Sequence, residues 1–379
     1  MLITVQVPSL DPMPLPGPVW LMTGLLLLVF TLHVLAMNAA LGGGIWTLWN
    51  YVRGKKPEHP NSRRLAEELA KMLPIFLAYT ITLGVAALLF VQVLYGRFLY
   101  ASSILIGGYW IMVIPLVILA YYGYYYVSYT AVKGKSRTGL VAALSVLCLL
   151  AIGFIFSNNM TLMLRPEVWL KMYRAHPDGF NLNLHDWELW PRYLHMMIGA
   201  VAVASALLAH LGMLKLKKDP EYGAWLVRRA AAVFAITTGI QFLDGLWLLL
   251  AVPRDVAMVF LRDPVAGTVF GLALMAVITA VILMVLGSMA DTPSPLVHVG
   301  VGMVVVTVFL MTGMRHLLRQ AYLAPYLDPG AVVVKPQTSA IVIFFVLFVG
   351  GLATVAMMLW KLAKYRKMQS LAGVGGATA

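Results

Sequence analysis

The sequence predicts an all-α integral membrane protein: a bundle of nine transmembrane helices, with the N-terminus outside and the C-terminus inside. Three observations predict this class. Hydrophobic residues make up 61% of the 379 residues and charged residues only 11%, a balance that does not suit a water-soluble globule. Apolar runs long enough to cross roughly 30 Å of hydrocarbon recur along the chain. Basic residues gather in alternate loops.

Each apolar run is predicted to be a helix, because unpaired strand edges are not tolerated in lipid. The predicted spans are 18–52, 72–100, 105–132, 138–164, 191–215, 223–252, 265–289, 296–320 and 338–362. We expect residues 1–366 to form a single transmembrane domain and residues 367–379 to form a flexible cytoplasmic tail.

The distribution of charge predicts the orientation. The loops after the first, third, fifth and ninth spans hold 18 of the 28 basic residues, whereas the loop around 288–295 holds none. The net charge of +13 therefore reflects an inner-face bias and predicts no nucleic-acid partner. We expect a multi-pass protein of a bacterial cytoplasmic (inner) membrane. Residues 1–18 lack the features of a signal peptide and are expected to lie along the outer face.

Histidines are the most informative polar residues. Five of the eight lie inside or at the ends of predicted spans, where ionisable groups are costly and rarely idle. At about 1.5 Å per residue, His33, His195 and His316 fall near the outer face, and His210 and His298 fall near the inner face.

Arginines accompany the outer histidines at the same depth: Arg192, Arg315 and Arg319. Imidazoles and arginines at one level are typical of a b-type haem, with iron bound to histidine and propionates bound to arginine. Hydrogen-bonded core histidines and a proton relay are the alternatives. For His210 and His298 the alternatives are an additional inner haem and packed core histidines. Cys148 is the single cysteine, so any haem is non-covalent.

Short motifs carry a family resemblance. Residues 192–197 read Arg-Tyr-Leu-His-Met-Met, Arg228-Arg229 leads into a span with Asp244-Gly245, and residues 316–322 read His-Leu-Leu-Arg-Gln-Ala-Tyr. On these residues the chain resembles subunit I of the cytochrome bd quinol oxidases over most of its helices. The resemblance implies nine helices with haems near the outer face. It also implies that His195 and His33 are haem ligands, and that His316 replaces a haem-ligating glutamate.

The chain also departs from that family. Span 105–132 has no acidic residue, whereas the family has glutamates there for proton delivery and oxygen reduction. The family's external quinol loop is reduced to residues 253–264. Its haem-ligating methionine in the seventh span has no clear counterpart, and Met258 and Met275 are weak candidates.

The resemblance and the departures together predict a membrane b-type cytochrome with two or three non-covalent haems. We expect it to oxidise quinol near the outer face and to pass electrons to a c-type cytochrome or another redox subunit in a membrane complex. The aromatic segment 166–190 is a candidate quinol site or an ordinary interfacial belt. Asp244, Glu188 and Asp186 are candidate proton acceptors, and pairing with Arg254 is the alternative for Asp244.

Two other functions stay open. One is an oxygen-reducing subunit of the bd type. The other is a haem-free, proton-coupled transporter or quinone-binding membrane anchor, which would use Asp244 and the histidines as a proton path.

Overall fold

A computed structural model describes residues 14–133, 137–327 and 333–375. Its secondary structure is helical, apart from an isolated bridge between Leu15 and Val334. The chain divides into two compact units. The larger comprises Met1–Asp11 and Thr23–Pro329, and the smaller comprises Pro12–Met22 and Gly330–Ala379.

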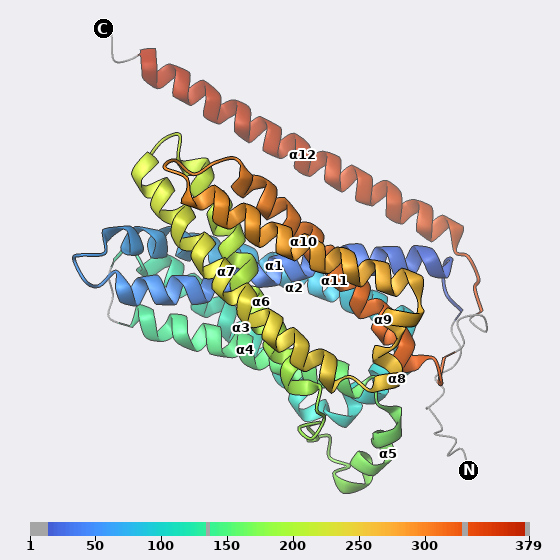
Figure 1. Cartoon of the computed structure of the whole chain (residues 1–379). Helices are drawn as coiled ribbons and strands as arrows, with labels where there is room; N and C mark the ends of the chain where they lie inside the picture. The colour runs from blue at the N-terminus through green and yellow to red at the C-terminus, as the bar shows by residue number, and fades with distance from the viewer. Residues whose placement is uncertain (1–13, 134–136, 328–332, 376–379) are drawn as a thin grey trace. The chain divides into compact units, whose positions relative to one another are not determined.

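Within the described residues, nine helices are long and apolar enough to cross a membrane. They are α1 (Val19–Arg53), α2 (Pro60–Leu105), α3 (Gly107–Thr130), α4 (Thr138–Leu162), α6 (Leu189–Lys215), α7 (Pro220–Ala251), α10 (Pro264–Met289), α11 (Leu296–Leu323) and α12 (Thr338–Gly375) (Figure 1). The prediction of an all-α chain with nine apolar helices of membrane-spanning length is thus confirmed for the part of the chain that the structure describes. The orientation stays a prediction.

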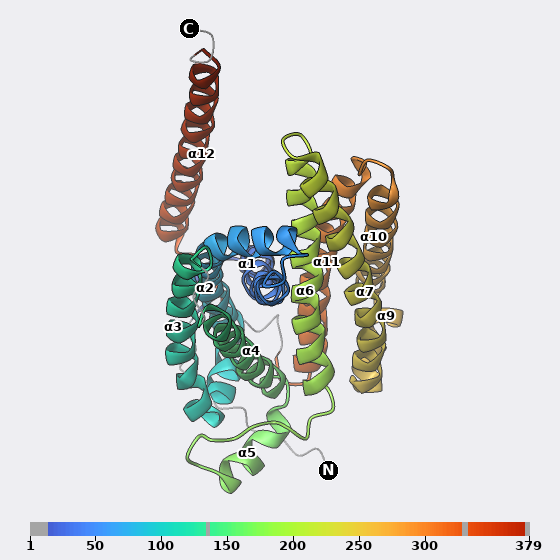
Figure 2. The ribbon, with the colours of Figure 1, turned by 90° about the vertical axis from the view of Figure 1, so that its left-hand side faces the viewer.

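Three short helices lie in the connections. An amphipathic helix, α5 (Pro166–Ala175), lies across the end of the larger unit, below α4 and α6 in Figure 2. The predicted loop 253–264 forms two single turns, α8 (Arg254–Ala257) and α9 (Val259–Arg262). Proline begins α5 and Asp263 caps α10 through a bond from the Ala266 amide, so local sequence fixes these boundaries.

Antiparallel pairs build the larger unit. α3 packs on α4, α6 on α7 and α10 on α11, and α7 and α6 then contact α10 and α11 respectively. α1 approaches α6 closely at Gly42, where an added Cβ would lie 2.1 Å from the Ala200 carbonyl oxygen. Small residues permit such close helix contacts in membranes, which is the role expected for this glycine.

α2 begins well before its predicted span, at Pro60 instead of residue 72. Its first turns are polar and are supported by the i,i+4 ion pairs Arg63–Glu67 and Arg64–Glu68. Hydropathy detects only the apolar part of such a helix. The backbone leaves helical geometry at Tyr95 (φ −133°, ψ 26°), which divides α2 near its C-terminal end.

In the smaller unit, α12 continues to Gly375. The predicted boundary of a flexible tail, at residue 366, therefore falls inside a helix. Residues 376–379 and the predicted outer-face segment up to residue 13 lie outside the described residues.

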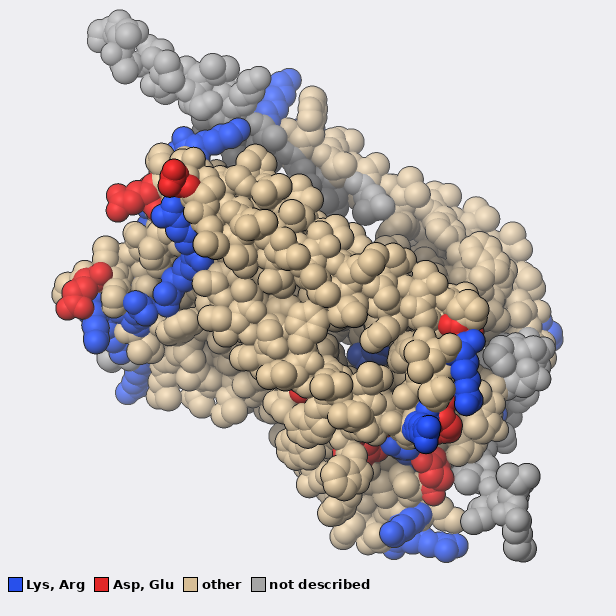
Figure 3. Space-filling model, in the orientation of Figure 1, with Lys and Arg blue, Asp and Glu red and all other residues tan. Residues whose placement is uncertain are grey.

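Charged side chains gather toward two ends of the face drawn in Figure 3, and a broad band almost free of charge separates them. This distribution is what a protein crossing hydrocarbon requires, because charge in the apolar layer is costly.

Candidate functional site

A cavity of about 480 Å³ lies among α1, α6, α7, α10 and α11 in the larger unit. This volume falls in the range of small-molecule and cofactor sites. Its walls are mainly aliphatic and aromatic, and its polar side chains include Asn38, Arg192, His195, Gln241 and Arg315. The face drawn in Figure 3 has a hollow in its uncharged surface, and a Lys or Arg side chain, drawn in blue, is visible at the bottom of that hollow.

His195 lines this cavity and is held by two contacts from α7. Its Nδ1 lies 3.0 Å from Oδ2 of Asp244, and Gln241 Nε2 donates to its backbone carbonyl at 3.0 Å. Asp244 is only 7% exposed, so the contact is nearly dry. The alternative pairing of Asp244 with Arg254 is wrong, because the Asp244 side chain turns toward α6 instead. A carboxylate on Nδ1 fixes the ring and leaves Nε2 available, as in metal-ligating histidines.

Two arginines near the cavity lack carboxylate partners among the described residues. Arg315 Nη1 lies 3.9 Å from the Met196 sulfur, and its guanidinium sits 4.9 Å from the Phe30 ring centroid. The guanidinium of Arg319, which is 8% exposed, lies 5.0 Å from the Tyr95 ring centroid. Buried cations of this kind are costly unless an anion compensates them.

His316 lies beside these arginines in a separate space. Its Nδ1 is buried and has no hydrogen-bond partner in the described structure. The adjoining cavity of about 10 Å³ has α1, α2 and α11 for walls and includes Phe30, Arg315 and Arg319. That volume suits a single water molecule. As packed, the space beside His316 does not fit a macrocycle.

His33 faces α2 and lines neither cavity. Its Nδ1 lies 3.0 Å from the Thr80 carbonyl oxygen, and its ring lies against Gly84, where a Cβ would come within 2.8 Å of the ring. Of the three histidines predicted as iron ligands, the structure therefore places only His195 in a space of cofactor size.

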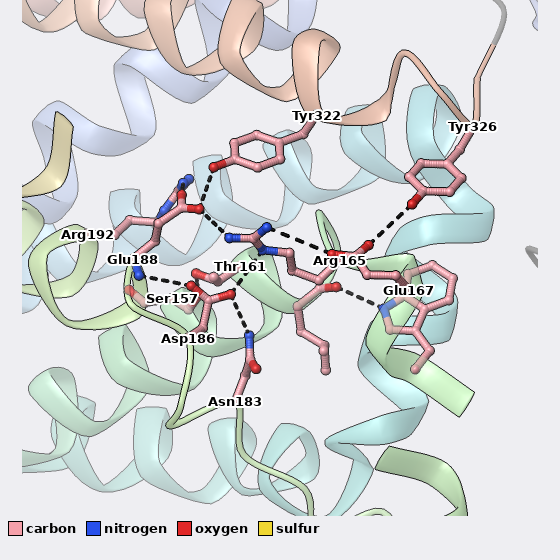
Figure 4. Close-up of polar contacts among 12 residues, drawn as sticks. Ser157, Thr161, Arg165, Glu167, Asn183, Asp186, Glu188, Arg192, Tyr322 and Tyr326 are labelled. Atoms are coloured by element: carbon pink, nitrogen blue, oxygen red, sulfur yellow. Dashed lines mark hydrogen bonds and ion pairs between the residues drawn. The ribbon is translucent and has the colours of Figure 1, made fainter. Parts of the chain in front are cut away.

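A charged network fills the region beside the cavity, where α4 ends and α6 begins (Figure 4). Glu188, 1% exposed, accepts from Arg165 Nη2 at 2.6 Å, from Arg192 Nη2 at 2.5 Å and from the Tyr322 hydroxyl. Asp186 accepts from Arg165 Nε at 3.1 Å. Burial lowers the pKa of Arg165, but the charges of Asp186 and Glu188 outweigh it and raise this pKa overall. Two of the three carboxylates predicted as proton acceptors, Asp186 and Glu188, are thus ion-paired with arginine.

At the rim of this network, Tyr326 donates to Glu167, at 3.3 Å. Burial and the negative Glu167 raise the pKa of Tyr326. Arg192 joins the network to the cavity, since it lines the cavity and binds Glu188. Its Nε has no acceptor among the described residues.

His210 and His298 contact each other toward the other end of the bundle. Their Nδ1 atoms lie 2.9 Å apart, so one ring donates to the other. This pairing differs from both alternatives considered from the sequence, an inner haem and backbone-bonded core histidines. Neither ring lines the larger cavity.

Sequence reasoning missed several site residues. Arg165 organises the network, and its signal was a loop arginine between an apolar span and the acidic cluster at 186–188. The methionines that line the cavity are Met37, Met196, Met311 and Met314. Met258 and Met275 do not line it, and Met275 is 61% exposed.

The residues around the larger cavity fit a b-type haem. An imidazole oriented by a carboxylate is at the wall, the walls are apolar, and Arg315 at the wall supplies positive charge that no carboxylate of the described residues balances. Arg319, one turn further along α11, lines the small space beside His316 and adds a second such charge nearby. The fit rests on this chemistry and on the cavity volume.

Comparisons with known proteins agree with the resemblance seen in the sequence. No family model matches the chain, and no curated protein matches it. Among solved structures, a chain of the bd oxidase from Geobacillus thermodenitrificans superposes with a TM-score of 0.67 at 12% identity, over 92% of this chain and 99% of that one. The chain is therefore similar in fold to a chain of a bd oxidase.

Proposed function

We propose that the protein is a membrane b-type cytochrome subunit that oxidises quinol and passes electrons to a c-type cytochrome or another redox subunit. The observation that carries the proposal is the His195–Asp244 pair at the wall of a cofactor-sized cavity, next to two arginines without counterions. Bound haem would supply one-electron redox chemistry, while the protein sets ligation, burial and charge.

In this proposal each residue has a defined part. His195 would hold the iron, Asp244 would orient His195, and Arg315 and Arg319 would bind the propionates. Met37, Met196, Met311 and Met314 offer thioether sulfurs along the same cavity. The proposal places one haem here, fewer than the two or three expected from the sequence, because the space at His316 is too small as packed and His33 lines neither cavity.

The quinol site belongs to the segment around α5. Tyr173, Phe180 and Trp187 are more than half exposed there, as a site at headgroup depth requires. Of the three carboxylates predicted as proton acceptors, Asp186 suits the role best, because it has one arginine partner and its other donors, the Asn183 amide and the Glu188 backbone N–H, are neutral. Glu188 has two arginines and a tyrosine, and Asp244 is committed to His195.

A second function, oxygen reduction, is favoured by the fold match to a bd oxidase. The absence of any acidic residue from α3 argues against it, because oxygen reduction consumes protons at the site.

A reduced-minus-oxidised visible spectrum of the purified protein tests the proposal. We expect b-type bands, together with reduction by a soluble quinol and no quinol-dependent oxygen uptake. Oxygen uptake would favour the oxidase. A colourless, well-folded preparation would contradict haem binding and leave a transporter or quinone anchor as the better description.

A further inference from the structure

A positively charged cluster lies where α1 and α7 approach each other, and none of its residues belongs to the cavity or the network. It consists of Trp49 and Arg53 at the end of α1 and Arg229 on α7. The Arg229 guanidinium lies 4.8 Å from the Trp49 ring centroid, and Trp49 is 44% exposed. Arg53 is near enough to act electrostatically on Arg229.

The two arginines are uncompensated. Neither forms an ion pair with a carboxylate in the described ranges, whereas neighbouring basic residues do: Arg64 binds Asp219 at 2.5 Å, and Lys215 binds Glu68 at 2.8 Å. The Nε of Arg229 is buried and has no hydrogen-bond partner in the part of the chain described. A donor shielded from water and left unpaired costs free energy, so the site favours an acceptor from outside the chain.

The position of the three residues identifies the acceptor. Arg53 ends a membrane-length helix, and exposed Lys55 and Lys56 follow it, so the cluster lies at headgroup depth. Tryptophan is typical of this depth. Paired cations between transmembrane helices suit the phosphates of anionic lipids, and arginine matches phosphate with two parallel donors.

We propose that Trp49, Arg53 and Arg229 form a binding site for the headgroup of an anionic phospholipid, with the two arginines on phosphate and the indole against the glycerol region. The site is independent of the haem proposal, because none of its residues lines either cavity.

Native mass spectrometry of the full-length protein with added cardiolipin or phosphatidylcholine tests this site. Cardiolipin is expected to bind preferentially, and the double variant Arg53→Gln/Arg229→Gln to bind it about tenfold more weakly. The matched control, Lys217→Gln/Lys218→Gln, removes the same charge from exposed positions and is expected to bind as the wild type does.

Two further arms keep the test decisive. Arg229→Lys retains the positive charge but loses the two parallel donors of arginine. Its affinity for cardiolipin is expected to lie between that of the wild type and that of the double variant. An intermediate affinity in this folded, charge-conserving variant would show that the loss in the double variant reflects binding and not misfolding. Thermal unfolding with inorganic phosphate is expected to show no shift, whereas cardiolipin raises the Tm. Equal cardiolipin binding in both double variants, or an equal Tm rise with phosphate, would overturn the lipid site.

Discussion

The cavity at His195 and the network at Glu188 are neighbours joined by Arg192, yet they are built in opposite ways. In the network, two carboxylates and two arginines are paired with each other. The cavity has a volume of about 480 Å³, and two arginines, Arg315 at its wall and Arg319 one turn further along α11, have no carboxylate partner among the described residues. Balanced, filled polar clusters stabilise a fold, whereas space with unbalanced charge indicates a site for a missing group.

The largest energetic effect is expected from Glu188→Gln. It leaves two partly buried arginines without the buried carboxylate that they share, at a cost of about 3–5 kcal/mol in the free energy of unfolding. Denaturation in detergent measures the loss. Glu167→Gln is the control, because its side chain is 44% exposed, and its cost stays within about 1 kcal/mol. Equal losses of unfolding free energy in Glu188→Gln and Glu167→Gln would contradict the stabilising role that we assign to the Glu188 network.

Asp244→Asn tests the cavity side of the comparison. The amide keeps the size of the side chain but weakens its hold on His195, so we expect haem affinity to fall about 10- to 100-fold. Haem titration of the depleted protein measures it. An unchanged affinity with unchanged spectra would remove Asp244 from the site.

Arg315→Gln addresses the unbalanced charge. Since the arginine has no carboxylate partner, its loss is expected to leave the stability of the haem-free protein unchanged or higher, while haem affinity falls about tenfold. Arg165→Gln, in the balanced network, is expected to lower stability and to spare haem affinity. If Arg315→Gln lowered stability and Arg165→Gln lowered haem affinity instead, the assignment of the cavity to haem binding and of the network to stability would be wrong.

The smallest effects come from a matched pair of tyrosines. Tyr322→Phe removes a hydrogen bond to buried Glu188 and is expected to cost about 1.5–3 kcal/mol. Tyr326→Phe removes a contact with half-exposed Glu167 and is expected to cost under about 1 kcal/mol. Because the pKa of Tyr326 is raised, its phenol stays protonated at neutral pH, and its contribution is lost only as the pH rises through that raised pKa. Chemical denaturation at pH 7 and at alkaline pH measures both.

Hydropathy sufficed to predict the helices, because the length and apolarity of a span are local properties. Depth along a helix was also predictable, and His195, Arg192 and Arg315 do line one cavity. The direction that a side chain faces was not predictable: His33 turns to α2, and Asp244 meets His195, 49 positions away, instead of Arg254. Polar helix ends, such as the first turns of α2, gave no hydropathy signal.

The central claim is that His195 carries haem iron, and the haem content of His195→Ala measured against His59→Ala tests it most directly. His59 precedes α2, away from the cavity, and serves as the control for losing an imidazole. We predict that the His195 variant, purified as a monodisperse species, loses the b-type bands of its reduced-minus-oxidised spectrum, and that the His59 variant keeps them. Equal haem content in the two folded variants would contradict the account.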